Sequence, residues 1–216
     1  RSSGYIGRQV VKELLRTEIP TIALVRSKDI PTKTLEYLQG AEIVRCNVLN
    51  PQEVMDPYTL HAPAATKCCL ASRSGVKRDV WAVDYQGSLN VLEAQESVQR
   101  AQKQFVLLSA YCCAKPMLQF QFAKLKLESR LQQSQALNYS IVRPTAFFKS
   151  VDGQVESILR GFPAVHFGPG SVLANPIAEE DLANFMIDCI VKPDEIGMTN
   201  AIRNVGGPDV PPLSKK

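Results

Sequence analysis

The spacing of apolar residues along the chain alternates between a pattern typical of buried strands and a pattern typical of helices. Short apolar runs predict strands over residues 21–26, 41–48, 66–72, 104–110 and 139–144. Apolar residues three and four positions apart predict helices over residues 5–15 and 79–97, from residue 51, over residues 124–133 and after residue 176. Such alternation predicts right-handed βαβ units, an α/β fold with a doubly wound parallel sheet of the NAD(P)-binding Rossmann type, and ligands at the carboxyl ends of the strands.

The alternation loosens after Thr145. The rest of the chain is rich in Gly and Pro, with one clear helix and a strand and turn around residues 204–208. We therefore expect a single NAD(P)-binding Rossmann-like domain over residues 1–216. Residues 146–216 form its small, irregular, substrate-binding part.

The first residues predict a phosphate-facing turn. Gly4 and Gly7, with Tyr5 and Ile6 between them, open an amphipathic helix, and a helix N-terminus offers N–H groups and partial positive charge to a pyrophosphate. The same spacing is also typical of an ordinary helix start. Arg1 stands where a further glycine would be expected. Because such a turn follows a strand, we expect a first strand upstream of residue 1 and low solubility of this chain by itself.

Residues at the ends of the next strands indicate the cofactor. Arg26 ends the first predicted strand, where a cation suits the 2′-phosphate of NADPH and an acidic residue would suit NADH. Ser27 and Lys28 add a hydroxyl and a second cation. Asn47 and Val48 end the next strand and either border the adenine or form a simple turn. We also place two residues after the following strand, Ala71 and Ser72, at the cofactor edge.

Composition narrows the class of protein. With 216 residues, 45% of them hydrophobic, the chain has enough apolar residues for a sizeable core. The formal net charge is +4, and acidic residues are interspersed among the cations, which favours a solvated surface over a nucleic-acid interface. No apolar run is close to the length of about 18 residues that a membrane span requires.

The cysteines and histidines predict no metal site. The six cysteines form no Cys-x-x-Cys pair, and we interpret them as reduced and mostly buried, with a redox or metal role as the alternative. Adjacent cysteines in a strand point to opposite faces, which disfavours the two doublets as zinc ligands. His61 and His166 are isolated in the sequence and are interpreted as structural or surface residues.

The candidate catalytic residues resemble those of the short-chain dehydrogenase/reductase family. That family carries a serine at the end of the fifth strand and a Tyr-x-x-x-Lys motif on the next helix, with the lysine holding the nicotinamide ribose. Ser109 and Lys124 match, but Phe120 takes the place of the tyrosine. A phenylalanine donates no proton, so alcohol–ketone chemistry is disfavoured and the chain is identified as an atypical member.

Several segments resemble the 8-vinyl-reductases of divinyl chlorophyllide, most specifically residues 143–150 with 153–157, and also residues 68–73, 105–110, 139–142 and 177–183. The resemblance implies NADPH-dependent reduction of the 8-vinyl group of a magnesium tetrapyrrole to ethyl. It also implies a chloroplast location with a transit peptide outside this chain, and peripheral association with plastid membranes. The chain departs from the pattern at Arg1, Asn47 and Tyr111.

Within this reaction, we hypothesise roles for particular residues. Lys124 would hold the nicotinamide ribose and Ser109 would order a polar group or water. The segment Pro144–Phe147, which includes Thr145, would cover the nicotinamide. Phe147 and Phe148 would stack on the flat macrocycle, although aromatic residues beside a strand are commonly core. Tyr111, expected on the same strand face as Ser109, is a candidate proton donor.

Two other functions stay open at the level of sequence. A related atypical reductase acting on another aromatic substrate would use Lys124 in the same way. A non-catalytic NADP-binding sensor or assembly protein would bind the cofactor without turnover, and Phe120 together with Arg1 favours that alternative.

Overall fold

The computed structural model describes residues 2–26, 30–149, 158–163 and 175–209 of the chain. Its strands are β1 (Ile22–Val25), β2 (Glu42–Arg45), β3 (Ala65–Cys68), β4 (Gln104–Leu108), β5 (Asn138–Pro144) and β6 (Ala201–Val205). Its helices include α1 (Tyr5–Arg16), α2 (Thr32–Leu38), α3 (Pro51–His61), α4 (Lys77–Val80), the π-helical turn η1 (Trp81–Gly87), α5 (Ser88–Ser97), the 3₁₀ turn η2 (Tyr111–Ala114), α6 (Gln119–Gln132) and α8 (Glu179–Val191).

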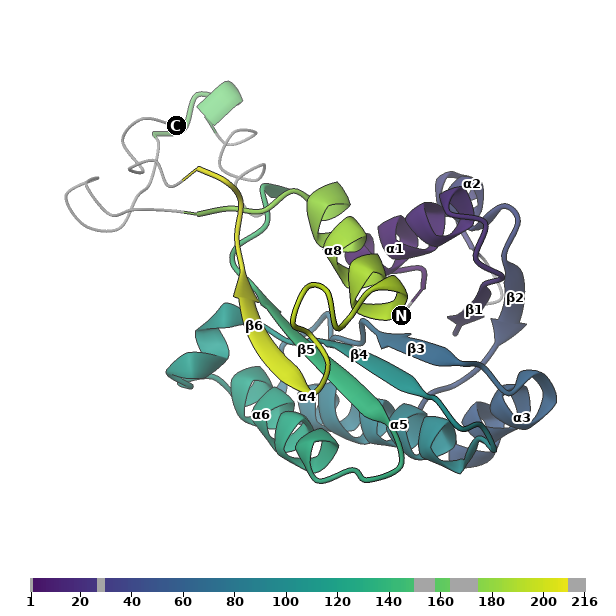
Figure 1. Cartoon of the computed structure of the whole chain (residues 1–216). Helices are drawn as coiled ribbons and strands as arrows, with labels where there is room; N and C mark the ends of the chain where they lie inside the picture. The colour runs from purple at the N-terminus through teal and green to yellow at the C-terminus, as the bar shows by residue number, and fades with distance from the viewer. Residues whose placement is uncertain (1, 27–29, 150–157, 164–174, 210–216) are drawn as a thin grey trace.

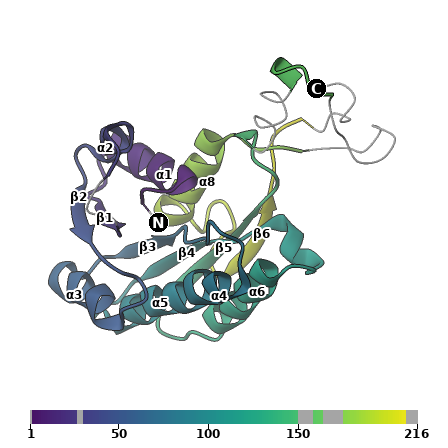
Figure 2. The same cartoon turned by 180° about the vertical axis from the view of Figure 1, so that it is seen from behind.

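The strands form two parallel sheets that lie side by side. The smaller sheet pairs β1 with β2, and the larger one has the order β3-β4-β5-β6. Helices α3, α4, α5 and α6 cover one face, and α1, α2 and α8 lie on the other (Figures 1 and 2). Helices on both faces of parallel strands confirm the predicted doubly wound α/β fold.

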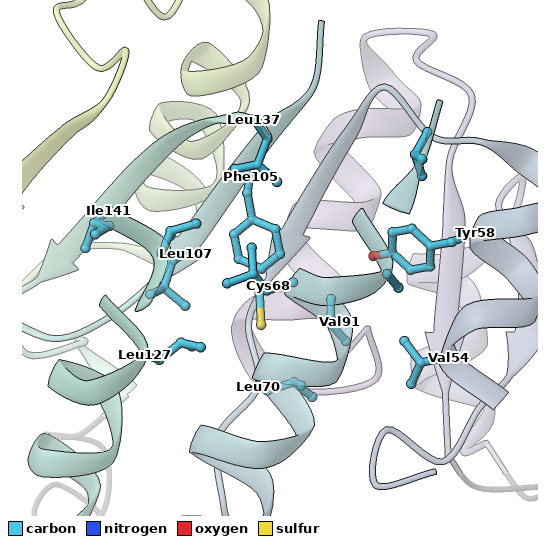
Figure 3. Close-up of a cluster of buried hydrophobic side chains, with 14 of the residues drawn as sticks. Val54, Tyr58, Cys68, Leu70, Val91, Phe105, Leu107, Leu127, Leu137 and Ile141 are labelled. Atoms are coloured by element: carbon cyan, nitrogen blue, oxygen red, sulfur yellow. The ribbon is translucent and has the colours of Figure 1, made fainter. Parts of the chain in front are cut away.

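Two apolar cores hold these layers together. The first lies between the sheet and α3, α5 and α6, where Phe105 and Leu107 of β4 meet Leu127 of α6 and Val91 of α5 (Figure 3). The second joins α1 and α8 to the opposite face of β4 and β5. All five residues of β4 are buried, because this central strand is covered on both faces.

The start of α3 is capped by Asn50. The Asn50 side chain accepts a hydrogen bond from the Gln52 amide at 3.1 Å, as an N-cap residue does. The Glu53 carboxylate accepts hydrogen bonds from the Asn47 amide (2.8 Å) and the Asn50 side-chain amide (2.9 Å), so the two do not form a reciprocal capping box. The Asn50 backbone amide donates to the Asn47 carbonyl instead, at 2.8 Å.

The structure corrects several predicted boundaries. The strands end before the polar residues assigned to their ends, and α6 begins at Gln119, before the predicted residue 124. Cys112 and Cys113 lie in η2, so the argument from opposite strand faces does not apply to that doublet. All six cysteines are free thiols, and Cys46, Cys68, Cys113 and Cys189 are buried.

The helix predicted over residues 79–97 contains a π-helical turn, which the apolar periodicity does not reveal. Gly87 ends this turn beside Val48, and a Cβ on Gly87 would lie 2.9 Å from the Val48 Cγ2. Glycine is therefore required at this position for the loop after β2 to approach the helix. Over the part of the chain that the structure describes, no helix has the length and apolar character needed to cross a membrane.

β1 and β3 are edge strands of their two sheets. Among the described residues, neither edge pairs with another strand, and unpaired strand edges recruit other chains. We expect the 216-residue chain, produced by itself, to self-associate as its concentration rises. Size-exclusion chromatography with light scattering tests this, and a monomer at every concentration would contradict it. The first strand expected from the sequence stays a prediction.

The ammonium nitrogen of Lys67, on β3, is buried without a hydrogen-bond partner among the described residues. Burial lowers the pKa of Lys67 to about 7, although Cys69 and, on α8, Cys189 and Asp188 act in the opposite direction. The unfolded chain, with a lysine pKa of about 10.4, therefore binds more protons than the folded chain between these values.

We predict that Lys67→Met stabilises the fold and that the gain depends on pH. The free energy of unfolding of the unmodified protein should fall as pH drops from about 10 to about 7, because charging Lys67 opposes folding. The gain from Lys67→Met should thus be largest below about pH 7 and shrink toward pH 10. Urea unfolding at several pH values measures this, with the exposed Lys33→Met as control. Equal gains at all pH values would refute it.

Candidate functional site

The centre of the site is the buried ammonium of Lys124 on α6, at the carboxyl ends of β3 and β4. Its Nζ donates hydrogen bonds to the carbonyl oxygens of Leu108 (3.1 Å) and Leu70 (3.4 Å). The side chain is 8% exposed, and Nζ lies 3.8 Å from the carboxylate of Asp84. A cation is thus held where a Rossmann-type sheet binds its ligand.

Asp84 joins this lysine to the loop that follows β3. It lies in η1 and is 2% exposed, and its Oδ2 accepts a hydrogen bond from the Ser72 amide at 2.7 Å. Ser72 and Lys124, both predicted from the sequence, are therefore brought together through a residue that the sequence analysis did not identify. Ala71, the other predicted residue of this loop, is exposed beside them.

Ser109 lies close by but belongs to a second charged group. Its hydroxyl donates to Oε1 of Glu128, which is one turn after Lys124 on α6. Arg143 of β5 forms an ion pair with the same carboxylate, with Nε to Oε1 at 3.1 Å, and this contact raises the pKa of the guanidinium. The nearby Cys113 stays a thiol, because burial raises its pKa. The hydroxyl hydrogen of Ser109 therefore points to Glu128.

The predicted phosphate-facing turn is a regular helix start. Gly4 is the N-cap of α1 with extended backbone, no side chain caps the helix, and the first turn contains no acidic residue. Ile6 and Gly7 are buried against the rest of the protein. The first N–H groups of a helix have no partner within it, so this end suits an anion. Arg1 lies outside the described residues.

Tyr5 connects the start of α1 to the C-terminal part of the chain. Its hydroxyl donates to Oε2 of Glu179, the first residue of α8, at 2.5 Å. Its ring meets the Phe147 ring edge-on at 6.0 Å, and the Lys149 ammonium lies 4.5 Å from the centre of the Tyr5 ring. The cofactor residue Tyr5 and the substrate residue Phe147, predicted separately, are therefore in contact.

The chain after β5 is fixed by the glycines that follow β6. The Thr145 amide donates to the Val205 carbonyl at 2.9 Å, and the Thr145 hydroxyl donates to the Asn175 carbonyl. Cβ atoms on Gly206 and Gly207 would lie 1.9 Å from Asn175 Oδ1 and 2.3 Å from the Pro176 carbonyl oxygen. Only glycine permits this approach, which orders the segment that begins at Pro144.

The two predicted stacking residues differ in environment. Phe147 pairs with Ile177 in an isolated β-bridge and packs against the core beneath α1 and α8. Phe148 is 50% exposed. Phe147 therefore has the core role that the sequence analysis weighed as the alternative, while Phe148 presents apolar surface. Residues 153–157, which carried part of the resemblance, lie outside the described residues.

At the other side of the site, Arg26 follows β1 directly and is exposed. Ser27 and Lys28 lie outside the described residues. Asn47 forms a turn, because its Oδ1 accepts from the Leu49 amide at 3.2 Å. Val48 is anchored by the Asn90 side chain, which donates to its carbonyl at 2.8 Å. The turn that the sequence left as an alternative to adenine contact is thus present.

Tyr111 does not lie on a strand face as expected. β4 ends at Leu108, and Tyr111 opens η2 with 51% of its surface exposed. The strand alternation that would align it with Ser109 is therefore absent, and the argument for Tyr111 as proton donor loses its geometric basis.

Sequence analysis missed Asp84 and the pair formed by Glu128 and Arg143. One signal was available for Glu128, since it stands four residues after Lys124 on the same predicted helix and therefore on the same face. No local signal identifies Asp84 or Arg143, because their partners are distant in the sequence.

These residues fit a dinucleotide. The uncapped α1 N-terminus suits a pyrophosphate, and the lysine at the strand ends can donate to ribose hydroxyls in addition to its carbonyl partners, since an ammonium has three hydrogens. The turn at Asn47 and Val48 follows β2 and the loop at Ala71 and Ser72 follows β3, so both lie at the carboxyl ends of parallel strands. A nicotinamide cofactor bound there would supply hydride chemistry.

Comparison with known proteins agrees with this arrangement. A family model described as NAD(P)H-binding matches residues 2–193. Solved structures of similar fold include UDP-glucose 4-epimerase from Thermotoga maritima with UDP-glucose, at 18% identity and a TM-score of 0.81 over 98% of this chain and 77% of that one. The NAD complex of the Thermus thermophilus UDP-glucose 4-epimerase matches at 17% identity and a TM-score of 0.77, over 99% of this chain and 78% of that one. At such identities the likeness concerns the fold.

Curated relatives are more similar in sequence. The chloroplastic divinyl chlorophyllide a 8-vinyl-reductases of Oryza sativa subsp. indica and Arabidopsis thaliana are 45% and 42% identical over 96% of this chain. The chain spans about half the length of these relatives, 53% and 52% respectively. The family model, the fold and the site agree, and the chain belongs to the NAD(P)H-binding family with a Rossmann-like fold.

Proposed function

We propose that the protein reduces the 8-vinyl group of divinyl chlorophyllide to ethyl with NADPH. The observation that carries the proposal is the identity of 41–45% over 96% of the chain to four vinyl-reductases. All four are named chloroplastic, and we infer the same compartment for this protein. Peripheral association with plastid membranes is part of the same proposal.

The chemistry of the site supports this reaction class. Carbonyl reduction requires an acid that protonates an alkoxide, and Phe120 supplies none at the position of the family's tyrosine. Reduction of a conjugated C=C bond adds a hydride and a proton to carbon, and a macrocycle can delocalise developing charge. The protein then mainly positions the substrate against the cofactor.

The described residues divide this task. Lys124 binds the nicotinamide ribose, and the α1 N-terminus with Gly4 and Gly7 binds the pyrophosphate. The segment from Pro144 to Phe147 covers the nicotinamide. The exposed Phe148 offers an apolar face to a flat substrate. Ser109 acts through the Glu128 pair, which holds α6 against β4 and β5.

The reaction itself is the direct test. The product of the complete gene is incubated with divinyl chlorophyllide and NADPH, and the pigments are separated by chromatography. We predict monovinyl product that depends on NADPH, and an activity about a hundredfold lower in Lys124→Ala, because a misplaced cofactor costs rates of that order. Lys126→Ala, an exposed lysine on the same helix, should retain activity.

Other outcomes identify the alternatives. NADPH binding with unchanged pigment would favour the sensor. Reduction of a different aromatic compound would favour the related reductase. Full activity in Lys124→Ala would remove this lysine from the cofactor site.

Cofactor choice gives a separate prediction for Arg26. A guanidinium at the end of β1 should bind the 2′-phosphate, and a hydrogen bond to a charged group contributes about 1.5–3 kcal/mol. Arg26→Ala should therefore raise the Kd for NADPH about ten- to a hundredfold and leave the Kd for NADH nearly unchanged. Nicotinamide fluorescence measures both values. Arg45→Ala, at the end of the neighbouring strand β2, is the matched control. Equal losses for both cofactors would contradict a 2′-phosphate contact.

A further inference from the structure

The π-helical turn η1 places one carboxylate deep inside the site. Trp81–Gly87 adopt this wider turn between α4 and α5, with Asp84 in the middle of it and 2% exposed. Single π-turns within α-helices occur frequently at functional sites. A buried carboxylate is costly unless it is paired and hydrogen-bonded, so the contacts of Asp84 are informative.

Asp84 connects two segments of the cofactor edge. Its Oδ2 accepts from the Ser72 amide at 2.7 Å, which ties down the loop after β3. Its Oδ1 lies 3.8 Å from the Lys124 ammonium, which also donates to the carbonyls of Leu70 and Leu108. The two carbonyls are neutral acceptors, whereas Asp84 supplies a negative charge.

We propose that Asp84 is a positioning residue that acts through Lys124, holding its ammonium in place for the nicotinamide ribose. The inference rests on the proposed binding of NADPH. Asparagine at this position keeps an oxygen acceptor for the Ser72 amide but removes the charge that faces Lys124. The substitution Asp84→Asn therefore separates the pairing with Lys124 from the anchoring of the loop.

A double-mutant cycle on NADPH affinity tests the proposal. Asp84→Asn should raise the Kd for NADPH about tenfold, because a displaced Lys124 ammonium loses a charge-assisted hydrogen bond to the ribose. In the Lys124→Met background the same substitution should have no further effect, because a residue that acts through Lys124 has nothing left to position. Asp79→Asn is the matched control, since Asp79 lies exposed in α4, where its carboxylate accepts a hydrogen bond from the Ser74 hydroxyl at 2.6 Å.

The outcomes distinguish this proposal from the proposed function. Additive losses in the cycle, or an unchanged Kd in Asp84→Asn, would overturn it. If the cycle is non-additive and pigment is not reduced, the role of Asp84 stands and the vinyl-reductase assignment fails. If Asp84→Asn alone does not fold, Lys124→Met is compared with the double variant, which contains no unpaired charge. Equal NADPH affinities then support the proposal, and unequal affinities overturn it.

Discussion

The site depends on the burial of one ammonium group at the carboxyl ends of two parallel strands. Lys124 is 8% exposed on its side chain, and a buried charge is tolerated only with acceptors around it. Two carbonyl acceptors, one after β3 and one at the end of β4, and the negative charge of Asp84 at 3.8 Å surround it. The position of α6, the loop after β3 and η1 are therefore coupled, since moving any of them would leave the cation unsatisfied.

The sequence predicted the elements well because local patterns determine them. The apolar runs and helical spacings located the strands and most of the helices, although the short helix α2 was not predicted. The cap at Asn50 follows from Asn50 and Pro51. The boundaries were less accurate, since the last residues of the strands predicted over 21–26, 41–48, 66–72 and 104–110 make no ladder pairs. η1 was missed because apolar spacing does not distinguish a π-turn from an α-helix, and the approach of Gly87 to Val48 joins distant parts of the chain.

The candidate site was predicted only in part. Lys124, Ser72 and Tyr5 do lie in contact networks at the expected edge, but their partners Asp84 and Glu179 are far away in sequence. The interpretation of Tyr111 relied on continuing the alternation of β4, and the 3₁₀ turn ends that alternation. A helical face can be read from spacing, whereas the pairing of buried charges requires the fold.

The inner face of α6 carries a cation and an anion one turn apart, and each is neutralised by a different layer. Lys124 pairs with Asp84 of η1, while Glu128 pairs with Arg143 of β5. Lys124 and Glu128 are four residues apart on one helix face and could pair with each other. Each instead has a partner of opposite charge from another element. Because Glu128 is occupied by the guanidinium and the Ser109 hydroxyl, its charge is held between α6 and the strands. The Lys124 ammonium donates to two carbonyls, so one of its three hydrogens remains for a further acceptor, which is the property that a ribose-binding cation needs.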